Sequence, residues 1–469
     1  MRDLVVIGGG AGGLVVASVA AQLGLDVVVI NKEEAMGGDC LHYGCVPSKV
    51  LLKSASVAHT MRHADRWGLP TVRADVDMQA INQAVKRAIA TIQPHDSRER
   101  FESLGCEVIT GEASFVSPSE ITVAGETASA KTITAKRIVV ATGSYAWIPP
   151  VEGLDQVDYL TNEDMFSLPY LPQRLTILGG GPVGVEMAQA YSRLGSEVSI
   201  IELAARLLPS GDEELSDILA RTLQAEGVRL ELAAEVERVS QLDGVKKIEL
   251  KAGGSIEADA LLVAVGRRPC MESLNLSSAN VDFDTRGIQV DRKMRTSNKR
   301  IYACGDVTGE MPLTHVAELQ AGIIIANMMF KLPKKISYEV VPAVVYTEPE
   351  VAQVGLSAEQ CEAHKHGEVH RFEVTELDRA VTDNAGSGVA KILTVKGKVV
   401  GAHIIAPHAG ELIHELALAV QQKMHISKIT SLVHAYPSYS QLNKRVAGQY
   451  YKDRLFSGFS KSIVKLLWR

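Results

Sequence analysis

The sequence predicts an α/β fold that contains the same β-α-β unit twice, followed by a third region of different character. Residues 4–31 and 175–202 both read as an apolar strand, a glycine-rich turn, a helix and a second apolar strand. In both units the second strand ends 23 positions after the first glycine of the turn. A chain of 469 residues is also too long for one hydrophobic core, so roughly two to four domains are expected.

The glycine-rich turns indicate two dinucleotide-binding sites. In such a turn the first glycine permits the tight bend, the second lets the backbone approach a pyrophosphate, and the third lets the helix pack on the strand. The diphosphate then lies at the helix N-terminus, where free N–H groups favour anions. One such turn is a weak signal, but two at matched positions predict two Rossmann-like domains. The glycines are Gly8, Gly10 and Gly13 in the first unit and Gly179, Gly181 and Gly184 in the second.

The residue that ends the second strand differs between the two units. This position usually supplies a carboxylate for ribose hydroxyls. Asn31 holds it in the first unit, which predicts weaker ribose binding because the amide carries no charge. Glu202 holds it in the second unit and would repel a 2′-phosphate, so NADH is favoured over NADPH. Arg206 is close enough in sequence to keep NADPH as an alternative.

A close pair of cysteines follows the first unit, in the segment from Asp39 to Lys49. Four residues separate Cys40 from Cys45, and we expect both at the start of a helix that continues through 50–53. A helix N-terminus lowers a thiol pKa and so favours the thiolate. A dinucleotide fingerprint followed by such a pair predicts a flavin beside a redox-active disulfide. The other cysteines are expected to be buried apolar residues, namely Cys106, Cys270, Cys304 and Cys361.

These motifs resemble those of the class I pyridine nucleotide–disulfide oxidoreductases, the family of lipoamide dehydrogenase, glutathione reductase and mercuric reductase. The resemblance covers nearly the whole chain and implies FAD at the first glycine turn, NAD(H) at the second, and a homodimer with a C-terminal α+β dimerisation domain. It implies four segments: an FAD-binding part (1–148), an NAD(P)-binding domain (149–270), a return to the FAD-binding domain (271–340) and an interface domain (341–469).

The resemblance also implies roles for residues around the cysteines. Cys45 is then the sulfur next to the flavin, and Cys40 is the thiol that attacks the substrate. Lys49 matches the family lysine near flavin N5, and Glu186 matches its ion-pair partner.

Further positions match the cofactor motifs of the family. Gly305 and Asp306 resemble the pair whose aspartate binds the ribityl chain, and Thr314 and His315 resemble the start of the helix that faces the isoalloxazine ring. Two glycines end strands that lead between the nucleotide domains, Gly143 on the FAD side and Gly266 on the NAD side.

The chain departs from the family at Asp39, where a threonine is usual. A carboxylate beside Cys40 would raise the thiol pKa and disfavour anionic substrates. The alternative is that Asp39 turns away and caps the helix.

The acid–base pair of the family is also replaced. The family supplies a histidine and a glutamate across the dimer interface, and the matching positions hold Tyr436 and Gln441. Tyrosine, with a pKa near 10, is a poor base at neutral pH. His434 is two residues away and is either a replacement base or a structural residue.

These departures leave several electron acceptors open. A lipoyl or other thiol/disulfide substrate is the leading interpretation, because the cofactor motifs look most like those of lipoamide dehydrogenase. Metal-ion reduction of the mercuric reductase type is the second, although no cysteine follows Cys361 to hand over a metal. A membrane-associated flavoprotein that reduces a quinone or a partner is the third, and a redox-sensing binding protein is the fourth.

The net charge and the cysteine content limit which classes of partner and which cell compartment we expect. The net charge of −6 argues against a nucleic-acid partner, since no basic surplus exists to neutralise phosphates. The six cysteines do not form a secreted disulfide framework, and the first strand begins at Leu4. We therefore expect a cytoplasmic protein without a signal peptide or a resident metal site.

The end of the chain, about 452–469, has the spacing of a basic amphipathic helix. It has a basic row of Lys461, Lys465 and Arg469 beside an apolar stripe of Phe459, Ile463 and Leu466. One interpretation is contact with a membrane surface or a partner, which would make the protein peripheral at the membrane. The alternatives are a helix packed on its own dimer and a disordered tail.

Overall fold

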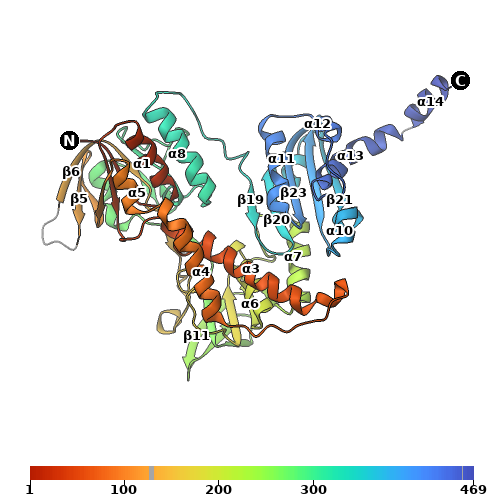
Figure 1. The fold of residues 1–469 in the computed structure, drawn as a ribbon, viewed down its shortest axis with the longest axis horizontal. Helices are drawn as coiled ribbons and strands as arrows, with labels where there is room; N and C mark the ends of the chain where they lie inside the picture. The colour runs from red at the N-terminus through yellow and green to blue at the C-terminus, as the bar shows by residue number, and fades with distance from the viewer. Residues whose placement is uncertain (126–130, 457, 469) are drawn as a thin grey trace.

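Three lobes make up the chain in the computed structural model, which describes residues 1–125, 131–456 and 458–468 (Figure 1). The first lobe contains the N-terminus, the second contains α6 and β11, and the third contains α11 and β23. The predicted α/β class is confirmed.

A seven-stranded sheet with the order β3-β2-β1-β6-β5-β4, and β18 beside β6, forms the first lobe. β1 pairs in parallel with β2 and β6, in register from Leu4↔Val27 to Ile7↔Ile30. Leu4 and Val6 pack with α1 and α8, whereas Val5 and Ile7 pack on the other face, so β1 is buried on both sides. The elements are β1 (Arg2–Ile7), α1 (Ala11–Gln22), β2 (Val27–Asn31), α5 (Arg98–Ser103), β3 (Glu107–Thr110), β4 (Glu112–Ser117), β5 (Glu120–Ala124), β6 (Lys131–Val140), β18 (Ile301–Ala303) and α8 (Thr314–Met328).

The second lobe repeats this arrangement around a four-stranded sheet. Its strand order is β10-β9-β8-β14, and all pairs are parallel. A separate antiparallel sheet, β11-β12-β13, lies beside it. The elements are β8 (Arg174–Leu178), α6 (Pro182–Leu194), β9 (Glu197–Glu202), α7 (Glu213–Ala225), β10 (Arg229–Leu232), β11 (Val236–Leu242), β12 (Val245–Leu250), β13 (Ser255–Ala258) and β14 (Ala260–Val263). Both β-α-β units are therefore where the sequence predicts them.

Helices and a short ribbon connect these two lobes. α3 packs on α4 and α6, and the three helices lie together in the middle of the molecule (Figure 1). The ribbon is the antiparallel pair of β7 and β15. The elements are α2 (Gly38–His42), α3 (Cys45–Arg62), α4 (Met78–Ile92), β7 (Ser144–Ala146) and β15 (Arg267–Pro269).

The third lobe is an antiparallel sheet with the order β19-β20-β23-β22-β21. α11 packs on β20 and β23, and α13 packs on β21 and β22. The elements are β19 (Ala343–Val345), β20 (Glu350–Gly355), α9 (Ala358–Glu362), β21 (Gly367–Glu373), α10 (Asp378–Thr382), β22 (Val389–Val395), β23 (Lys398–Ala406), α11 (Ala409–Gln421), α12 (Ser427–Ser431), α13 (Gln441–Leu455) and α14 (Gly458–Leu467). The domain boundaries proposed above stay predictions.

The described helices do not include one that is long and apolar enough to cross a membrane.

Candidate redox site

The two cysteines lie in two helices, which corrects the prediction of one helix. Cys40 is in α2, and Cys45 is the first residue of α3, with a break at Tyr43 and Gly44. A Cβ added to Gly44 would lie 3.3 Å from Cα of Cys40, so this residue allows the two helices to approach closely. Cys45 is the first residue of an 18-residue helix, a position that favours a thiolate, whereas Cys40 is the third residue of a five-residue helix.

The two sulfurs are free thiols with opposite pKa shifts. A hydrogen bond with Cys40 lowers the pKa of Cys45 to about 6, and Thr314 and Lys49 act in the same direction. The same hydrogen bond and burial raise the pKa of Cys40 far above its usual value. Oγ1 of Thr314, the first residue of α8, lies 3.4 Å from Sγ of Cys45. Near neutral pH the pair therefore holds one proton on Cys40 and a thiolate on Cys45.

Lys49 and Glu186 form an ion pair beside this thiolate. Nζ of Lys49 lies 2.8 Å from Oε2 of Glu186, whose side chain is only 7% exposed. Each is the fifth residue of its helix, Lys49 in α3 and Glu186 in α6, and the two helices lie side by side. Near the other ends of the two helices, Nη2 of Arg62 donates to the carbonyl oxygen of Arg193 at 3.0 Å, so α3 and α6 run in the same direction. This packing brings together Lys49 and Glu186, which are 137 positions apart.

Tyr346 completes this cluster and was not predicted from the sequence. Its backbone N–H donates to Oε1 of Glu186 at 2.9 Å, and its ring centroid lies 4.4 Å from Nζ of Lys49. Tyr346 directly follows β19, and the sequence pattern there indicates a strand before Pro349 but no site residue. The third lobe thus contributes directly to the site.

The first glycine turn fits the FAD that the fold implies. Gly8 has φ +111°, and a Cβ there would lie 2.2 Å from the carbonyl oxygen of Ala141. A Cβ on Gly13 would lie 2.1 Å from the carbonyl oxygen of Gly8, whereas one on Gly10 would meet only Cα of Gly38 at 3.9 Å. The backbone is therefore packed on one side and open at Gly10, where a diphosphate would approach the N-terminus of α1.

The second turn has the same geometry. Gly179 has φ +106°, and a Cβ on Gly184 would lie 2.0 Å from the carbonyl oxygen of Gly179. Nothing lies within 4 Å of a Cβ on Gly181. Glu202 accepts hydrogen bonds from the backbone N–H groups of Gly180 (2.6 Å) and Ala204 (2.7 Å). Its remaining lone pairs are available for ribose hydroxyls.

Asn31 occupies the place of Glu202 in the first turn and uses both ends of its amide. Its Oδ1 accepts from the N–H of Gly9 at 2.9 Å, as Glu202 does from Gly180. Its Nδ2 donates to the carbonyl oxygens of Glu33 (2.7 Å) and Ala35 (3.1 Å). A carboxylate could not make the last two bonds, so the asparagine is part of the loop structure.

Asp306 and Gly143 lie around Arg267, a second residue that was not predicted. Nε of Arg267 donates to Oγ of Ser144 at 2.7 Å, and Ser144 donates to Oδ2 of Asp306 at 2.6 Å. Ser144 and Arg267 directly follow Gly143 and Gly266, both of which have positive φ (+72° and +140°). The pairing of β7 with β15 brings them together, which could not be read from either strand alone.

Asp39 acts to raise the pKa of Cys45 and not that of Cys40, the sulfur that it was expected to influence. Its Oδ1 accepts from Nδ2 of Asn162 at 2.9 Å and lies 3.2 Å from Nη2 of Arg267. The N-cap of α2 is Gly37, so Asp39 is not the cap either. The raised pKa of Cys40 comes from Cys45 and burial, which corrects the expected effect of Asp39.

Gly305 and His315 have structural contacts near the same edge. The N–H of Gly305 donates to Oε1 of Gln320 at 2.6 Å. Nε2 of His315 lies 2.9 Å from the carbonyl oxygen of Pro342, so this ring is tied to the start of the third lobe.

The substituted acid–base segment lies at the surface of the third lobe. Tyr436 is 68% exposed, and Gln441 is the first residue of α13. The side chain of His434 is buried, and its Nε2 lies 3.2 Å from Oε1 of Glu415. Its Nδ1 lies 3.3 Å from the carbonyl oxygen of Leu432, so both ring nitrogens have partners, which favours the structural interpretation over that of a replacement base.

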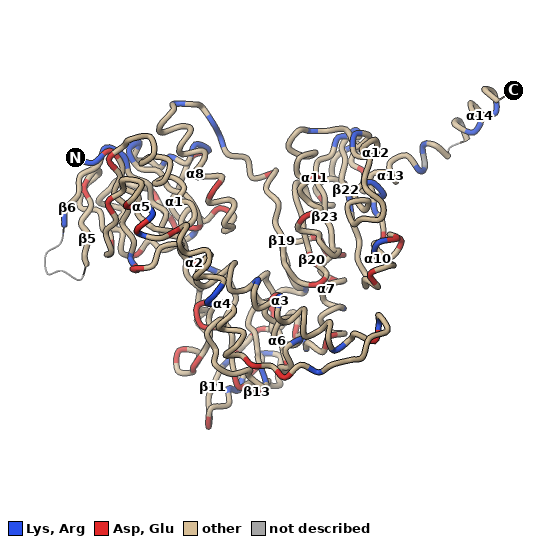
Figure 2. The backbone as a smooth tube through the Cα atoms, in the orientation of Figure 1, with Lys and Arg blue, Asp and Glu red and all other residues tan. Residues whose placement is uncertain are grey.

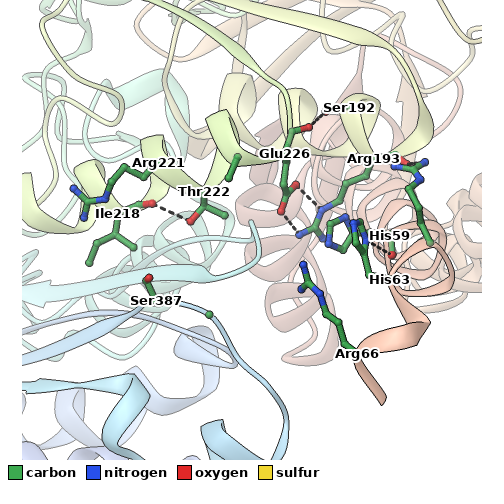
Figure 3. A pocket seen from close by; sticks show the side chains of 13 residues that line it. His59, His63, Arg66, Ser192, Arg193, Ile218, Arg221, Thr222, Glu226 and Ser387 are labelled. Atoms are coloured by element: carbon green, nitrogen blue, oxygen red, sulfur yellow. Dashed lines mark hydrogen bonds and ion pairs between the residues drawn. The ribbon is translucent and has the colours of Figure 1, made fainter. Parts of the chain in front are cut away.

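A cavity of about 520 Å³ lies apart from the sulfurs, at the C-terminal end of α3 (Figure 3). Six of its thirteen lining residues are arginine or histidine. One of them, Arg193, uses its guanidinium on Glu226, at 2.7 and 2.8 Å, and on Glu348. Ser192 also donates to the carbonyl oxygen of Glu226 at 2.9 Å. These contacts fasten α6 to the turn after α7 and to the third lobe. Among the described residues, no group of three or more His, Cys, Asp or Glu is arranged to hold a metal ion.

Comparison with known proteins agrees with this geometry. Residues 2–321 match the family described as pyridine nucleotide-disulphide oxidoreductase, and residues 341–446 match its dimerisation domain, which supports a homodimer. A mercuric reductase of Bacillus cereus is 35% identical over 92% of this chain and 69% of its own length. The mitochondrial dihydrolipoyl dehydrogenase of Pisum sativum is also 35% identical, over 95% of this chain and 91% of its own length.

A solved structure with the same fold is the Cu(II) complex of the HOCl-induced flavoprotein disulfide reductase RclA from Escherichia coli. It has a TM-score of 0.87 and 26% identity, over 95% of this chain and 99% of that one. Because the family model and the full-length relatives agree, the chain belongs to the class I pyridine nucleotide–disulfide oxidoreductases, which use FAD and NAD(P)H.

Proposed function

We propose that this chain is an NADH-dependent reductase that passes electrons through FAD to the Cys40–Cys45 pair and then to a thiophilic metal ion. The electron path rests on the Cys45 thiolate held between Thr314 and the Lys49–Glu186 ion pair. The observation that carries the choice of a metal ion is the replacement of the acid–base pair by Tyr436 and Gln441. Bound FAD would supply the two-electron step between nicotinamide and sulfur.

The residues around the two sulfurs have different roles in the proposed reaction. Thr314 and Lys49 stabilise negative charge on Cys45, the sulfur that we place next to the flavin. Cys40 keeps its proton because its pKa is raised, and it becomes a nucleophile when that proton leaves. Glu186 orients Lys49 and is itself fixed by the backbone of Tyr346. Gly143, Gly266, Gly305, Asp306 and His315 stay proposed cofactor-site residues.

The choice of acceptor rests on the residues that replace the acid–base pair. Thiol–disulfide exchange at Cys40 needs a group that moves a proton to and from sulfur. Tyr436 is a poor base and Gln441 carries no charge. Both ring nitrogens of His434 already have partners, Glu415 and the carbonyl oxygen of Leu432. A soft metal ion displaces the Cys40 proton to solvent as it binds, so it needs no group that returns a proton to a leaving thiolate. A lipoyl-type disulfide is the second candidate, since relatives of both kinds are equally similar to the chain.

The test compares acceptors in the wild type and in a variant with the family's acid–base pair restored. NADH oxidation is measured with Hg²⁺, Cu²⁺ and lipoamide. We expect slow lipoamide turnover in the wild type and at least a tenfold increase in Tyr436→His/Gln441→Glu, with unchanged metal-ion rates. Cys40→Ser is the control and should abolish metal-ion reduction. Fast lipoamide turnover by the wild type, or metal reduction that survives Cys40→Ser, would reject the proposed acceptor.

The preference for NADH follows from Glu202 and Arg206. The carboxylate of Glu202 is fixed by two N–H groups at the ribose position and would repel a 2′-phosphate. Nη2 of Arg206 donates to the carbonyl oxygens of Pro209 (2.9 Å) and Gly211 (3.3 Å), which holds the guanidinium at its own loop. We expect kcat/KM to be higher for NADH than for NADPH and the ratio to fall in Glu202→Gln. A cytoplasmic location belongs to this proposal.

A further inference from the structure

The C-terminal helix α14 extends away from the third lobe and has little contact with the rest of the described chain (Figure 1). It follows α13, whose last turn is anchored because Nη2 of Arg454 lies 2.7 Å from Oε1 of Glu368. Arg454 also stacks on the ring of Tyr450, with 3.8 Å between the guanidinium carbon and the ring centroid. The direction in which the chain leaves the lobe is therefore set by packed residues.

Large apolar side chains on this segment are exposed and not packed in a hydrophobic core. Leu466, Leu467 and Trp468 are 72%, 77% and 89% exposed. Ile463 and Val464 are also exposed, as are Leu455 and Phe456 just before the helix. So many exposed large apolar side chains in one short segment are unusual on a free surface and mark a site of contact. The side chain of Phe459 and residue Arg469, both part of the expected pattern, lie outside the described residues.

The basic side chains lie on the other side of the same helix. At 100° per residue, Lys461 and Lys465 fall opposite Ile463 and Leu467. The segment 458–468 contains no Asp or Glu, although the whole chain carries a net charge of −6 (Figure 2). Lysines opposite an apolar face, next to a terminal tryptophan, are the arrangement of helices that lie in the headgroup region of an anionic bilayer.

We propose that residues 455–468 form an anchor that binds this protein to the surface of an anionic membrane. The helix lies flat, with Ile463 and Leu467 facing the acyl chains and Lys461 and Lys465 near lipid phosphates. Its ten residues are too few to span a bilayer, so the contact is peripheral. The inference does not depend on which acceptor the enzyme reduces.

The test is sedimentation of the FAD-loaded protein with vesicles of phosphatidylcholine alone and of phosphatidylcholine with 30 mol% phosphatidylglycerol. We expect binding only to the vesicles with phosphatidylglycerol, and a loss of at least tenfold in partition when residues 455–469 are deleted. Ile463→Ser/Leu467→Ser should lose binding as the deletion does. Lys461→Glu/Lys465→Glu should do the same, whereas Lys334→Glu/Lys335→Glu, which changes the charge equally on another exposed loop, should retain it.

Unchanged NADH-driven flavin reduction in all variants would show that the variants fold. A loss of vesicle binding could then be distinguished from a failure of the proposed function. Equal partition of the wild type and the deletion would overturn the proposal. A change of oligomeric state on deletion, without vesicle binding by the wild type, would also overturn it and assign the apolar face to a second copy of the chain.

Discussion

Nζ of Lys49 lies 2.8 Å from Oε2 of Glu186, and this one contact joins the helix that begins at Cys45 to the helix that begins at the second glycine turn. The other oxygen of Glu186 accepts from the backbone N–H of Tyr346, so the connecting helix α3, the second lobe and the third lobe meet there. A carboxylate that is almost fully buried between two partners fixes both of them in place.

Glu186→Gln is expected to slow flavin reduction by NADH without loss of FAD. The amide can still accept from Tyr346 but no longer neutralises Lys49, and a hydrogen bond to a charged group is worth about 1.5–3 kcal/mol. Stopped-flow reduction should therefore be roughly 10- to 100-fold slower. The control is Glu197→Gln, the same substitution at the exposed start of β9. Gln189, one turn after Glu186, is unsuitable as a control because its side chain donates to the backbone of Glu348 in the third lobe. A normal rate in Glu186→Gln would remove the ion pair from the proposed mechanism.

The thiolate of Cys45 should titrate with a midpoint near pH 6 in the two-electron-reduced holoenzyme, in which the cysteines are reduced and the flavin is oxidised. Its pKa is about 6, below the usual thiol value, so the thiolate is present above that pH and is lost as the pH falls through it. The long-wavelength absorbance that a thiolate gives beside oxidised flavin reports this change.

Thr314→Val removes one hydrogen bond to this thiolate and should move the midpoint upward by about one pH unit. Thr308→Val, which loses a hydroxyl bound only to the carbonyl oxygen of Gly305, is the matched control. A band that persists unchanged to pH 5, or a midpoint near 8.5 in the wild type, would contradict the assignment.

Asp212 ties the second lobe to the third, and Asp212→Asn should destabilise their contact. Its side chain is 3% exposed, caps α7, and receives Nζ of Lys391 at 2.7 Å and Nδ1 of His403 at 2.9 Å. Removal of one member of a buried pair costs about 3–5 kcal/mol, which urea unfolding of the holoenzyme would detect.

The same carboxylate predicts a dependence of stability on pH. Burial would raise the pKa of Asp212, but hydrogen bonds from His403 and Lys391 hold it well below its usual value. Its contribution is therefore fully present above the unfolded pKa, about 4, and is lost as the pH falls through the lower folded value. The stability gap between wild type and Asp212→Asn should shrink below pH 4, and a constant gap would contradict this account.

The sequence predicted those parts of the molecule that depend on local spacing. Glycine turns and apolar strands gave both β-α-β units, because a strand, a turn and a helix are neighbours in the chain. The resemblance to the family supplied Lys49 and Glu186, which spacing alone could not relate across 137 positions.

The remaining contacts depend on tertiary pairing. Arg267 reaches the site because β15 pairs with the distant strand β7. Tyr346 reaches it because the start of the third lobe packs against α6, where its backbone N–H donates to Glu186. The carboxylate of Asp39 was expected to raise the pKa of Cys40, but it contacts Asn162 and Arg267 and acts on the pKa of Cys45 instead. The break at Gly44 shows that two cysteines close in sequence can still lie in different helices.

Asn31→Asp, which restores the usual family carboxylate, is expected to weaken this protein rather than improve it. Nδ2 of Asn31 donates to the carbonyl oxygens of Glu33 and Ala35, and a carboxylate would place negative charge against both. Loss of these bonds should cost about 1–3 kcal/mol and lower the melting temperature of the holoenzyme. Glu202→Gln tests the same logic in reverse, because both oxygens of Glu202 accept N–H bonds and the new amide would face one of them with a donor. If Asn31→Asp bound FAD more tightly at unchanged stability, Asn31 would weaken ribose binding without stabilising the loop, and this account would be wrong.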